Sequence, residues 1–553
     1  MIADTKNNNR LYSTKQIIQR AWEELKINHK QVISKTLLGI IVVLLDLAFV
    51  WVTKMTIDIA TGASDSYTLK ESSLILILII FTEIFVSSTN RWIQSVLSVK
   101  STNRLQRKIF SLVINSDYLA IKNYHSGDLI NRIEKDSETF ISAIINSIPD
   151  FVIILTKLIG AFFLLFFMDK NLAYIIIFLV PFFLILSRLY VKKMRILTRE
   201  IRSSESRIQA LMQENIQNSI IIKTLQRIDF IISKLSCMQD TLCQQVKNRT
   251  HYSIASTTIM SIGFATGYLV TFLWGTTKLS QGAITYGALL AFIQLVGQIQ
   301  GPARNIMKFI PIIINAATSC ERIMEIEKTS QEVEHPSTLL KDKLGIKIEN
   351  VCFNYVPEKQ IIKDFSYTIP PCSKVAIMGE TGAGKTTLIK LILALLSPTQ
   401  GMVSYYDENN SVIADKYTRK YITYVPQGNT LFSGTIRENL LLGNPNATQE
   451  QMEWALRLAD AKFVFQLKTG LDTQCNEGGT SLSEGQAQRI CIARALLKDN
   501  NIIFLDEATS ALDSQTEINV IKNICTEFQD KTILFISHRP AILDYCTQVL
   551  NIK

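Results

Sequence analysis

Six long apolar segments lie in the first three-fifths of the chain, and their lengths predict helices that cross a membrane. The first five contain 17 to 19 residues each, close to the roughly 20 residues that an α-helix needs to span a hydrocarbon core. The sixth contains Gln294 and Gln298, so it fits a long helix beside a wet cavity, with a core helix of a soluble protein as the alternative. The segments cover residues 36–53, 73–89, 151–168, 172–189, 257–275 and 286–299.

A different pattern begins at Gly345, where short β-branched runs alternate with amphipathic helical stretches. This alternation is typical of an α/β domain built on a mainly parallel sheet. We predict buried strands at Lys374–Gly379, Ile502–Asp506 and Thr532–Ser537, and a helix over Lys385–Leu396. The chain of 553 residues is therefore expected to hold an all-α, six-helix transmembrane domain (residues 1–325), a linker (326–344) and an α/β domain (345–553).

Positive charge is concentrated in two of the loops between the apolar segments. Eight Lys or Arg lie between Arg91 and Lys135 and twelve between Arg188 and Arg249, whereas each of the other loops holds one or two. The positive-inside rule places these basic loops, both termini and the α/β domain in the cytosol. We therefore expect a multi-pass protein of a bacterial cytoplasmic membrane. Topology accounts for the net charge of +10, and nucleic acid is not expected as a partner.

The two basic loops are long and poor in Gly and Pro, so the membrane helices are expected to continue into the cytosol. Their tips are the parts of the transmembrane domain that could reach the α/β domain. We predict contacts at Tyr124–Arg132 and Glu214–Leu225. The alternative is that both loops are solvated helical hairpins.

Three ionisable residues, Asp46, Glu83 and Lys157, fall inside predicted spans. Charged groups are costly in lipid and usually face a cavity, a partner or the bundle interior. Each is therefore a candidate contact for a transported molecule. An internal polar pair with a structural role is the alternative, and it is favoured for any one of them.

The sequence GETGAGKT, residues 379–386, follows the first predicted strand and opens the predicted helix. Gly379, Gly382 and Gly384 allow backbone N–H groups to point at phosphate oxygens, and the helix N-terminus adds a favourable partial charge. In such a loop, Lys385 supplies a cation to the β- and γ-phosphates and the Thr386 hydroxyl can bind magnesium. The pattern predicts ATP and Mg²⁺ as cofactors.

The strand at Ile502–Asp506 ends in two adjacent acids. Asp506 is expected to hold magnesium, directly or through water, and Glu507 to orient or deprotonate the attacking water. His538 follows another strand of the same predicted sheet and could contact the γ-phosphate, the alternative being a structural histidine.

These motifs, with LSEGQ at residues 482–486, resemble those of the ATP-binding-cassette (ABC) family in content and order. GETGAGKTT, IIFLDE, SALD and His538 are similar to the Walker A motif, the Walker B motif, the D-loop and the H-loop. Gln427 in YVPQ resembles the Q-loop glutamine, and Tyr355 in FNY resembles the aromatic residue that stacks on adenine. Six spans followed by one such domain resemble the exporter-type half-transporters. The resemblance implies a P-loop NTPase of ABC type that couples ATP hydrolysis to transmembrane transport.

The resemblance also implies how ATP is held. Two α/β domains would dimerise head to tail, with ATP between residues 379–387 of one copy and Ser483–Gly485 of the other; the amides that begin the helix after Ser483 need an anion. The implied catalytic residues are Glu507, His538, Gln427 and Lys385, and the implied magnesium ligands are Thr386, Gln427 and Asp506. The implied ATP-binding residues are Tyr355, Gly379, Glu380, Thr381, Gly382, Ala383, Gly384, Lys385, Thr386, Thr387, Ser483, Gly485, Gln486 and Asp513.

Two features depart from the family pattern. Glu484 stands in the signature motif where the family more often has Gly, and we expect its side chain to point away from the bound phosphates. The sequence also ends at Lys553, soon after a predicted strand. Contacts between copies through a longer C-terminal segment are therefore not expected.

The leading hypothesis is ATP-driven export of an amphiphilic substrate, which is a peptide, a lipid or a drug-like molecule. Export would occur by alternating access in a dimer that is embedded in the lipid bilayer, with a second half-transporter as partner, most simply an identical copy. One alternative is an importer of the siderophore type on the same scaffold, and another is one subunit of a heterodimeric exporter. A soluble cassette ATPase acting on DNA or ribosomes is disfavoured by the six apolar segments.

Overall fold

Two compact units make up the chain in the computed structural model. The membrane unit comprises Met1–Phe110 and Gly127–Glu327, and the α/β unit comprises Ser111–Ser126 and Lys328–Lys553. The α/β unit thus includes a short segment from the first basic loop, far from the rest of that unit in sequence. The structure describes residues 12–64, 67–122, 124–332, 339–341, 343–356, 359–380, 382–476, 479, 481–537 and 539–552.

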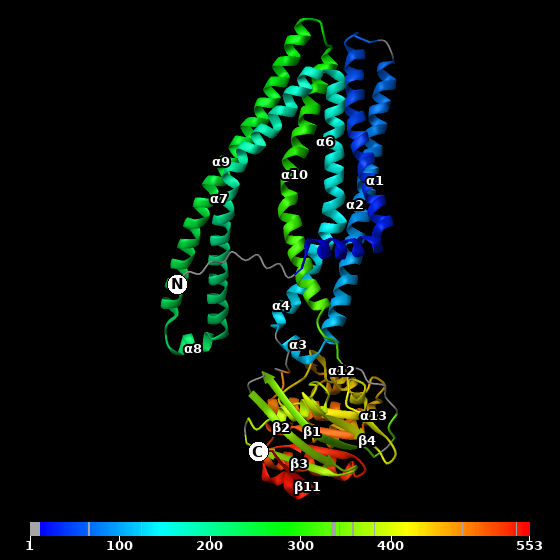
Figure 1. The fold of residues 1–553 in the computed structure, drawn as a ribbon, viewed down its shortest axis with the longest axis vertical. Coiled ribbons are helices and arrows are strands. Elements are labelled where there is room, and N and C mark those ends of the chain that lie inside the picture. Colours follow the sequence, from blue (N-terminus) through cyan, green and yellow to red (C-terminus); the bar gives the residue numbers. More distant parts are fainter. Residues whose placement is uncertain are drawn as a thin grey trace. The chain divides into compact units, whose positions relative to one another are not determined.

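Helices build the membrane unit, and six of those in its described residues are long (Figure 1). These six are α1 (Thr14–Ala60), α2 (Leu69–Ile114), α6 (Ile148–Met168), α7 (Lys170–Gln217), α9 (Ile228–Ser280) and α10 (Tyr286–Glu327). A helical stretch of α4 (Ser126–Asn131), η1 (Arg132–Asp136), α5 (Ser137–Ser142) and η2 (Ala143–Ser147) leads directly into α6, with wider π-type turns at η1 and η2. Helices α7 and α9 run side by side, and α8 (Ser219–Thr224) joins their ends (Figure 1).

Four helical stretches among the described residues are long and apolar enough to cross a membrane, namely Thr14–Ala60, Leu69–Ile114, Ser126–Met168 and Ile228–Ser280. Helix α7 begins with a shorter apolar run, Lys170–Phe183. Helix α10, which contains the sixth apolar segment, has Pro302 and Pro311 in its interior. The predicted fold class of this half, all-α with six long helices, is confirmed.

The three ionisable residues predicted inside the spans lie together in the membrane unit. The Lys157 ammonium on α6 donates a hydrogen bond to Asp46 on α1. The Glu83 carboxyl on α2 is within hydrogen-bonding reach of Asp46. Because an ion pair offsets part of the cost of charge in a membrane, the arrangement fits the structural alternative, and a role in substrate contact stays a prediction.

The α/β unit contains two main sheets and a short ribbon in its described residues. The central parallel sheet has the strand order β11-β3-β10-β9-β6, and an antiparallel sheet has the order β2-β1-β4-β5. The parallel strands are β3 (Lys374–Gly379), β6 (Ile422–Val425), β9 (Ile502–Asp506), β10 (Thr532–Ile536) and β11 (Gln548–Ile552). The other strands are β1 (Gly345–Val356), β2 (Lys359–Ile369), β4 (Gln400–Tyr406), β5 (Ser411–Ile413), β7 (Gly434–Thr435) and β8 (Gln474–Cys475).

Buried aliphatic residues on both faces of the central sheet explain why its strands read as continuous apolar runs. All five residues of β9 and all five of β10 are buried. Two clusters form this core, one with the helices of the signature region and one with the antiparallel sheet. The helices of the unit are α11 (Lys385–Ile392), α12 (Ile436–Leu441), α13 (Gln449–Leu458), α14 (Glu484–Leu496) and α15 (Ser514–Glu527). The prediction of an α/β fold on a mainly parallel sheet is confirmed, and α11 ends four residues before its predicted end.

The contact predicted at Tyr124–Arg132 is correct only for its first residues, because the part of the first basic loop that belongs to the α/β unit ends at Ser126. The segment from the first basic loop that packs in the α/β unit carries the short helix α3 (Tyr118–Lys122), and Tyr118 and Leu119 pack against its buried core. Arg132 instead bonds to Asp128 (2.7 Å) and Glu325 within the membrane unit. The charged residues around Asp128 therefore form ion pairs between helices of the membrane unit. The residues that pack in the α/β unit, Tyr118 and Leu119, come before them in sequence.

Candidate functional site

The glycine-rich loop joins the end of β3 to the start of α11. Gly384 is the N-cap of α11 and has a φ of 92°, a left-handed conformation that favours glycine. A Cβ on Gly379 would lie 2.4 Å from the backbone oxygen of Ile552, so β11 requires glycine there. The Lys385 ammonium donates to the backbone oxygens of Gly379 and Glu380. The loop thus places a buried cation directly beside the amides that begin α11.

The two acids at the end of β9 have different surroundings. Asp506 is buried, and one of its oxygens, Oδ2, accepts a hydrogen bond of 3.0 Å from the Tyr424 hydroxyl. Glu507 has a φ of 46°, an uncommon conformation for a residue other than glycine that is often found at functional sites. The Gln427 amide donates to Glu507 Oε2 at 2.6 Å. Residues from β6 and the turn after it therefore engage both acids.

Burial raises the pKa of the Asp506 carboxyl above its usual value, and the neighbouring charge of Glu507 adds to the increase. The Tyr424 hydroxyl and the ammonium groups of Lys390 and Lys385 act in the opposite direction, because they stabilise the carboxylate. Asp506 thus lies in a dry site where a further cation would be strongly favoured electrostatically.

Tyr355 on β1 is 38% exposed at the edge of this site. Its ring packs edge-on against Phe353, with 4.9 Å between the centroids, and its hydroxyl lies 3.4 Å from Thr387 Oγ1 on α11. The Lys122 ammonium of α3 lies 5.2 Å from the centre of the Tyr355 ring. The aromatic residue predicted to stack on adenine is therefore joined to the phosphate loop and to the docked segment.

The LSEGQ motif forms the start of α14. Ser483 is the N-cap, and its hydroxyl accepts from the Gln486 amide while the Gln486 side chain accepts from the Ser483 N–H. This capping box fixes the first turn. A Cβ on Gly485 would lie 2.9 Å from the backbone oxygen of Ala511, so α14 packs closely on the SALD segment. Glu484 is exposed at the first position of α14, and its orientation away from bound phosphates stays a prediction.

The other described residues that were predicted for the site lie at the starts of α15 and α11 and in the loop between β3 and α11. Asp513 caps α15 by accepting a hydrogen bond of 3.0 Å from the Thr516 amide, which lowers the pKa of the Asp513 carboxyl. Thr386 is exposed on the first turn of α11, and Thr387 beside it is buried. Glu380, Gly382 and Ala383 lie in the loop between β3 and α11. Thr381 and His538 lie outside the described residues.

Three residues near this site were not predicted from the sequence: Tyr424, Lys390 and Tyr118. Tyr424 occupies a strand position two residues before Pro426, where an ordinary core residue would be expected. Lys390 lies on α11, and Tyr118 comes from a loop more than 250 residues away in sequence. A tyrosine in a basic loop has no sequence pattern that marks it as a neighbour of an ATP site. Only the tertiary structure shows that Tyr118, Lys390 and Tyr424 lie near this site.

The fold and the site together define a class of protein. A phosphate loop, a strand that ends in two acids, and a capped LSEGQ helix occupy one α/β unit, and the same chain supplies a bundle of membrane helices. Such a chain is a membrane protein with a fused P-loop ATPase.

Comparison with known proteins agrees with this class. Residues 32–303 match the sequence profile of the family described as ABC transporter transmembrane region, and residues 362–510 match that of the family described as ABC transporter. The chain is 28% identical over 553 residues to an ATP-dependent lipid A-core flippase of Desulfotalea psychrophila, covering 98% of this chain and 95% of that protein. It is 24% identical over 545 residues to a Bacillus subtilis protein whose name provisionally assigns it to multidrug export, with 97% and 94% covered.

A solved structure, that of a bacterial Atm1-family ABC exporter with ATP bound, has the same fold. The TM-score is 0.78 over 95% of this chain and 94% of that chain, at 19% identity. The chain belongs to the ABC transporters, as an exporter half-transporter with its membrane and ATPase domains fused. It is an ATP-hydrolysing transporter.

Proposed function

We propose that the chain exports an amphiphilic substrate across the cytoplasmic membrane by alternating access in a homodimer. The observation that carries the proposal is the convergence of Lys385, Asp506, Glu507 and Gln427 at one edge of the central sheet, in a chain that also holds the signature helix. All groups required for one ATP site are thus encoded in a single sequence. A second, different subunit is not needed to complete it.

The donor atoms at this edge fit magnesium. Thr386 offers a hydroxyl, Asp506 a carboxylate and Gln427 an amide oxygen, and Mg²⁺ prefers oxygen ligands from one or two carboxylates together with substrate phosphates. When bound, the ion neutralises charge that develops on the phosphates. In this proposal, Lys385 leaves its loop carbonyls for the β- and γ-phosphates, and Glu507, held by Gln427, accepts a proton from the attacking water. Thr386 and Asp506 orient the nucleotide, and His538 is assigned to the γ-phosphate.

A second copy would close the site. The first amides of α14 after Ser483 form a ready anion-binding end of a helix, and Gly485 keeps that turn free of a side chain. ATP held by the phosphate loop of one copy could therefore be covered by Ser483 and Gly485 of the other. Binding would bring the two α/β units together, and hydrolysis would release them.

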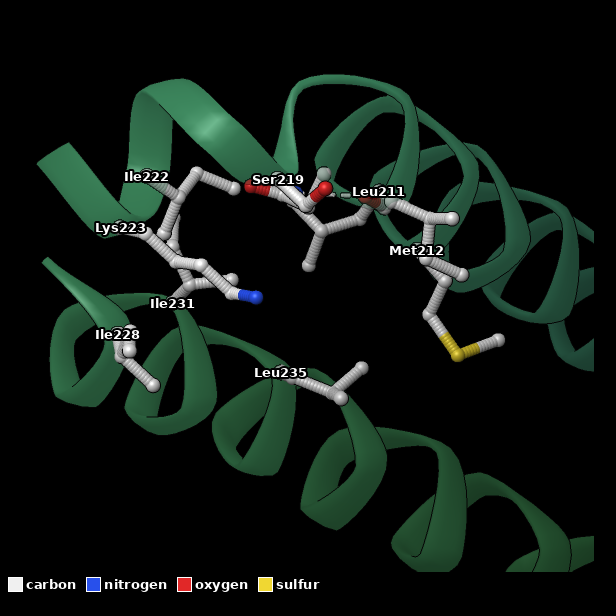
Figure 2. A pocket seen from close by; sticks show the side chains of 10 residues that line it. Leu211, Met212, Ser219, Ile222, Lys223, Ile228, Ile231 and Leu235 are labelled. Atoms are coloured by element: carbon white, nitrogen blue, oxygen red, sulfur yellow. Dashed lines mark hydrogen bonds between the residues drawn. The ribbon is translucent and has the colours of Figure 1, made fainter. Parts of the chain in front are cut away.

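The surface around α8 supports a dimer for a different reason. An apolar groove of about 330 Å³ lies between the end of α7, α8 and the start of α9, with Ile222, Ile231 and Leu235 among its lining residues (Figure 2). Ile216, which also lines the groove, and Ile220 are 73% and 77% exposed. Because large exposed apolar patches mark interaction sites, we assign this surface to contact with the α/β unit of the second copy. The predicted contact at Glu214–Leu225 stays a prediction.

Export is favoured over import because several curated relatives of this chain carry export or flippase names. Two of these names concern a lipid and drugs, both of which are amphiphiles. The six long helices would surround the substrate, and movements of the α3 and α8 segments would change the side to which the cavity opens. Both termini are assigned to the cytosol by the charge distribution of the loops.

Transport in proteoliposomes tests this proposal. The purified chain is reconstituted, and fluorescent phospholipid, amphiphilic dye and apolar peptide are offered in turn on the side of the ATPase domain. We expect ATP-dependent movement of at least one of these away from the ATPase side, and none with the Glu507→Gln chain. Movement toward the ATPase side would establish an importer, and absence of any ATP-dependent movement with the whole panel would contradict amphiphile export.

A further inference from the structure

The loop of residues 510–512 lies between the acids at the end of β9 and helix α15, and it is neither helix nor strand. It packs against the first turn of α14, where a Cβ on Gly485 would lie 2.9 Å from the backbone oxygen of Ala511. The first turn of α14 carries Ser483 and Gly485, which the proposed dimer uses to cover ATP. The position of this loop therefore bears on the position of the signature segment, residues 482–486.

Arg539, in the segment after β10, binds the loop through its backbone. Its guanidinium donates to the backbone oxygens of Ser510 at 3.0 Å and Leu512 at 3.2 Å. A third bond, of 2.6 Å, goes to Glu517 Oε2 on α15. Because the donors of an arginine lie in one rigid plane, these three acceptors are fixed relative to one another.

Glu517 keeps the guanidinium in this place. Its side chain is 2% exposed, and its other oxygen, Oε1, accepts a bond of 2.7 Å from the Thr509 hydroxyl. A buried carboxylate needs such partners, because an unpaired charge away from water is costly. One carboxylate is thus joined to both ends of the loop, directly to Thr509 and through Arg539 to Leu512.

Gln488 holds the same loop from the signature helix. This side chain is buried on α14, about one turn after Gly485. Its Oε1 accepts from the Ala511 amide at 3.0 Å, and its Nε2 donates to the Ser510 hydroxyl at 3.2 Å. Helix α14 and the loop are therefore joined by side-chain hydrogen bonds as well as by close packing.

Resting on the proposed ATP site between two copies, we propose that Arg539 and Gln488 are positioning residues for the signature segment. Arg539 fixes the backbone of the loop, and Gln488 holds the first turns of α14 against it. The amides after Ser483 then have one orientation before a second copy arrives. Little further ordering is needed when the shared site closes, which favours closure. Neither residue contacts ATP in the proposed site.

Two substitutions release the loop from opposite sides without leaving a buried charge unpaired. Arg539→Lys keeps a cation for Glu517 but lacks the planar group that reaches both loop oxygens. Gln488→Met keeps the length of a buried side chain and loses both of its bonds. Hydrogen exchange of the full-length chain without nucleotide, followed by mass spectrometry, measures local order. We expect about 10-fold faster exchange of residues 508–513 and 483–487 in each variant.

Cross-linking between copies measures the consequence for the shared site. A photoreactive residue in place of Ser481, in Glu507→Gln chains, reports contact with residues 379–387 of a second copy. The ATP concentration for half-maximal cross-linking should rise about 10-fold in Arg539→Lys and in Gln488→Met. Affinity for ADP, which has no γ-phosphate to be covered, should equal that of the parent chain, a result that a general loss of structure would not give.

Arg457→Lys is the matched control. It alters an exposed arginine on α13 that is paired with Glu453, and it should change neither exchange nor cross-linking. A thermal unfolding midpoint close to that of the parent establishes that the variants are folded.

Parent-like exchange and cross-linking in folded Arg539→Lys and Gln488→Met chains would overturn the inference and leave the shared site intact. An effect of Arg539→Lys alone would also overturn it, because the effect would then be assigned to the neighbouring His538 and not to the loop. The absence of any ATP-dependent cross-link in the parent chain would instead contradict the shared site on which the inference rests.

Discussion

Replacing Glu507 with Gln is expected to lower the steady-state rate of ATP hydrolysis by about 10²- to 10⁴-fold, the usual contribution of a general base. The substitution keeps the size of the side chain and its bond to Gln427, whose amide donates to Glu507 at 2.6 Å. Only the ability to accept a proton is lost. Release of inorganic phosphate by the purified chain in lipid measures the effect.

ATP binding should persist in the Glu507→Gln chain, because the phosphate loop is untouched. Glu527→Gln, which neutralises an exposed acid at the end of α15, provides the control and should hydrolyse ATP at the parent rate. Substantial hydrolysis by Glu507→Gln would show that another group takes the proton. Loss of ATP binding would instead mean that the acid shapes the nucleotide pocket.

Lys385→Ala is expected to reduce kcat/KM for ATP by about 100-fold or more, since it removes a buried cation that is preorganised for the phosphates. Unlike Glu507→Gln, this variant should also lose affinity for ATP, because the cation contacts the phosphates before the reaction begins. Equilibrium binding of a fluorescent ATP analogue, together with phosphate release, separates the two effects.

Because Lys385 also bonds to the backbone oxygens of Gly379 and Glu380, its removal could loosen the loop. Lys363→Ala removes an exposed lysine from the same unit and controls for the change in charge. An unfolding midpoint like that of the parent establishes that the fold is intact. Normal ATP affinity in a folded Lys385→Ala chain would contradict the proposed role.

Local patterns were sufficient to predict the strands that carry the site. β3, at Lys374–Gly379, and β9, at Ile502–Asp506, have the predicted bounds, because the interior positions of a strand that is covered on both faces are apolar. The glycine-rich loop and Lys385 come directly after β3, and Glu507 comes directly after β9. Because these connections are so short, the two strands largely determine where the phosphate loop and the acids lie.

Tertiary contacts were much harder to predict. The contact was predicted at Tyr124–Arg132 because the tip of the first basic loop was expected to reach the α/β domain, whereas Tyr118 and Leu119, earlier in that loop, carry the apolar contact. Tyr424 looks like a core residue of β6 until its hydroxyl is seen to reach Asp506. Contacts between residues far apart in sequence depend on packing, for which a single sequence gives no direct signal.

In the membrane unit, too, local structure could be predicted from the sequence and tertiary contacts could not. Segment length predicted the spans, yet the π-type turns at Arg132–Asp136 and Ala143–Ser147 have no evident sequence signal. The buried Lys35 ammonium donates to the backbone oxygens of Ile145 and Asn146, both in the second of these turns. A lysine near the end of a span would ordinarily be expected to extend toward water, so this interaction could not be predicted.

The most direct test of the composite ATP site is photo-cross-linking from the signature segment. Ser481, exposed two residues before Ser483, is replaced by benzoylphenylalanine in Glu507→Gln chains, and unlabelled and heavy-isotope-labelled copies are mixed before assembly. With ATP and Mg²⁺ present, irradiation should join this segment to residues 379–387 in peptide pairs that combine a light and a heavy chain. Cross-links confined to single copies, or equal yields without ATP, would contradict an ATP site shared between two copies of this chain.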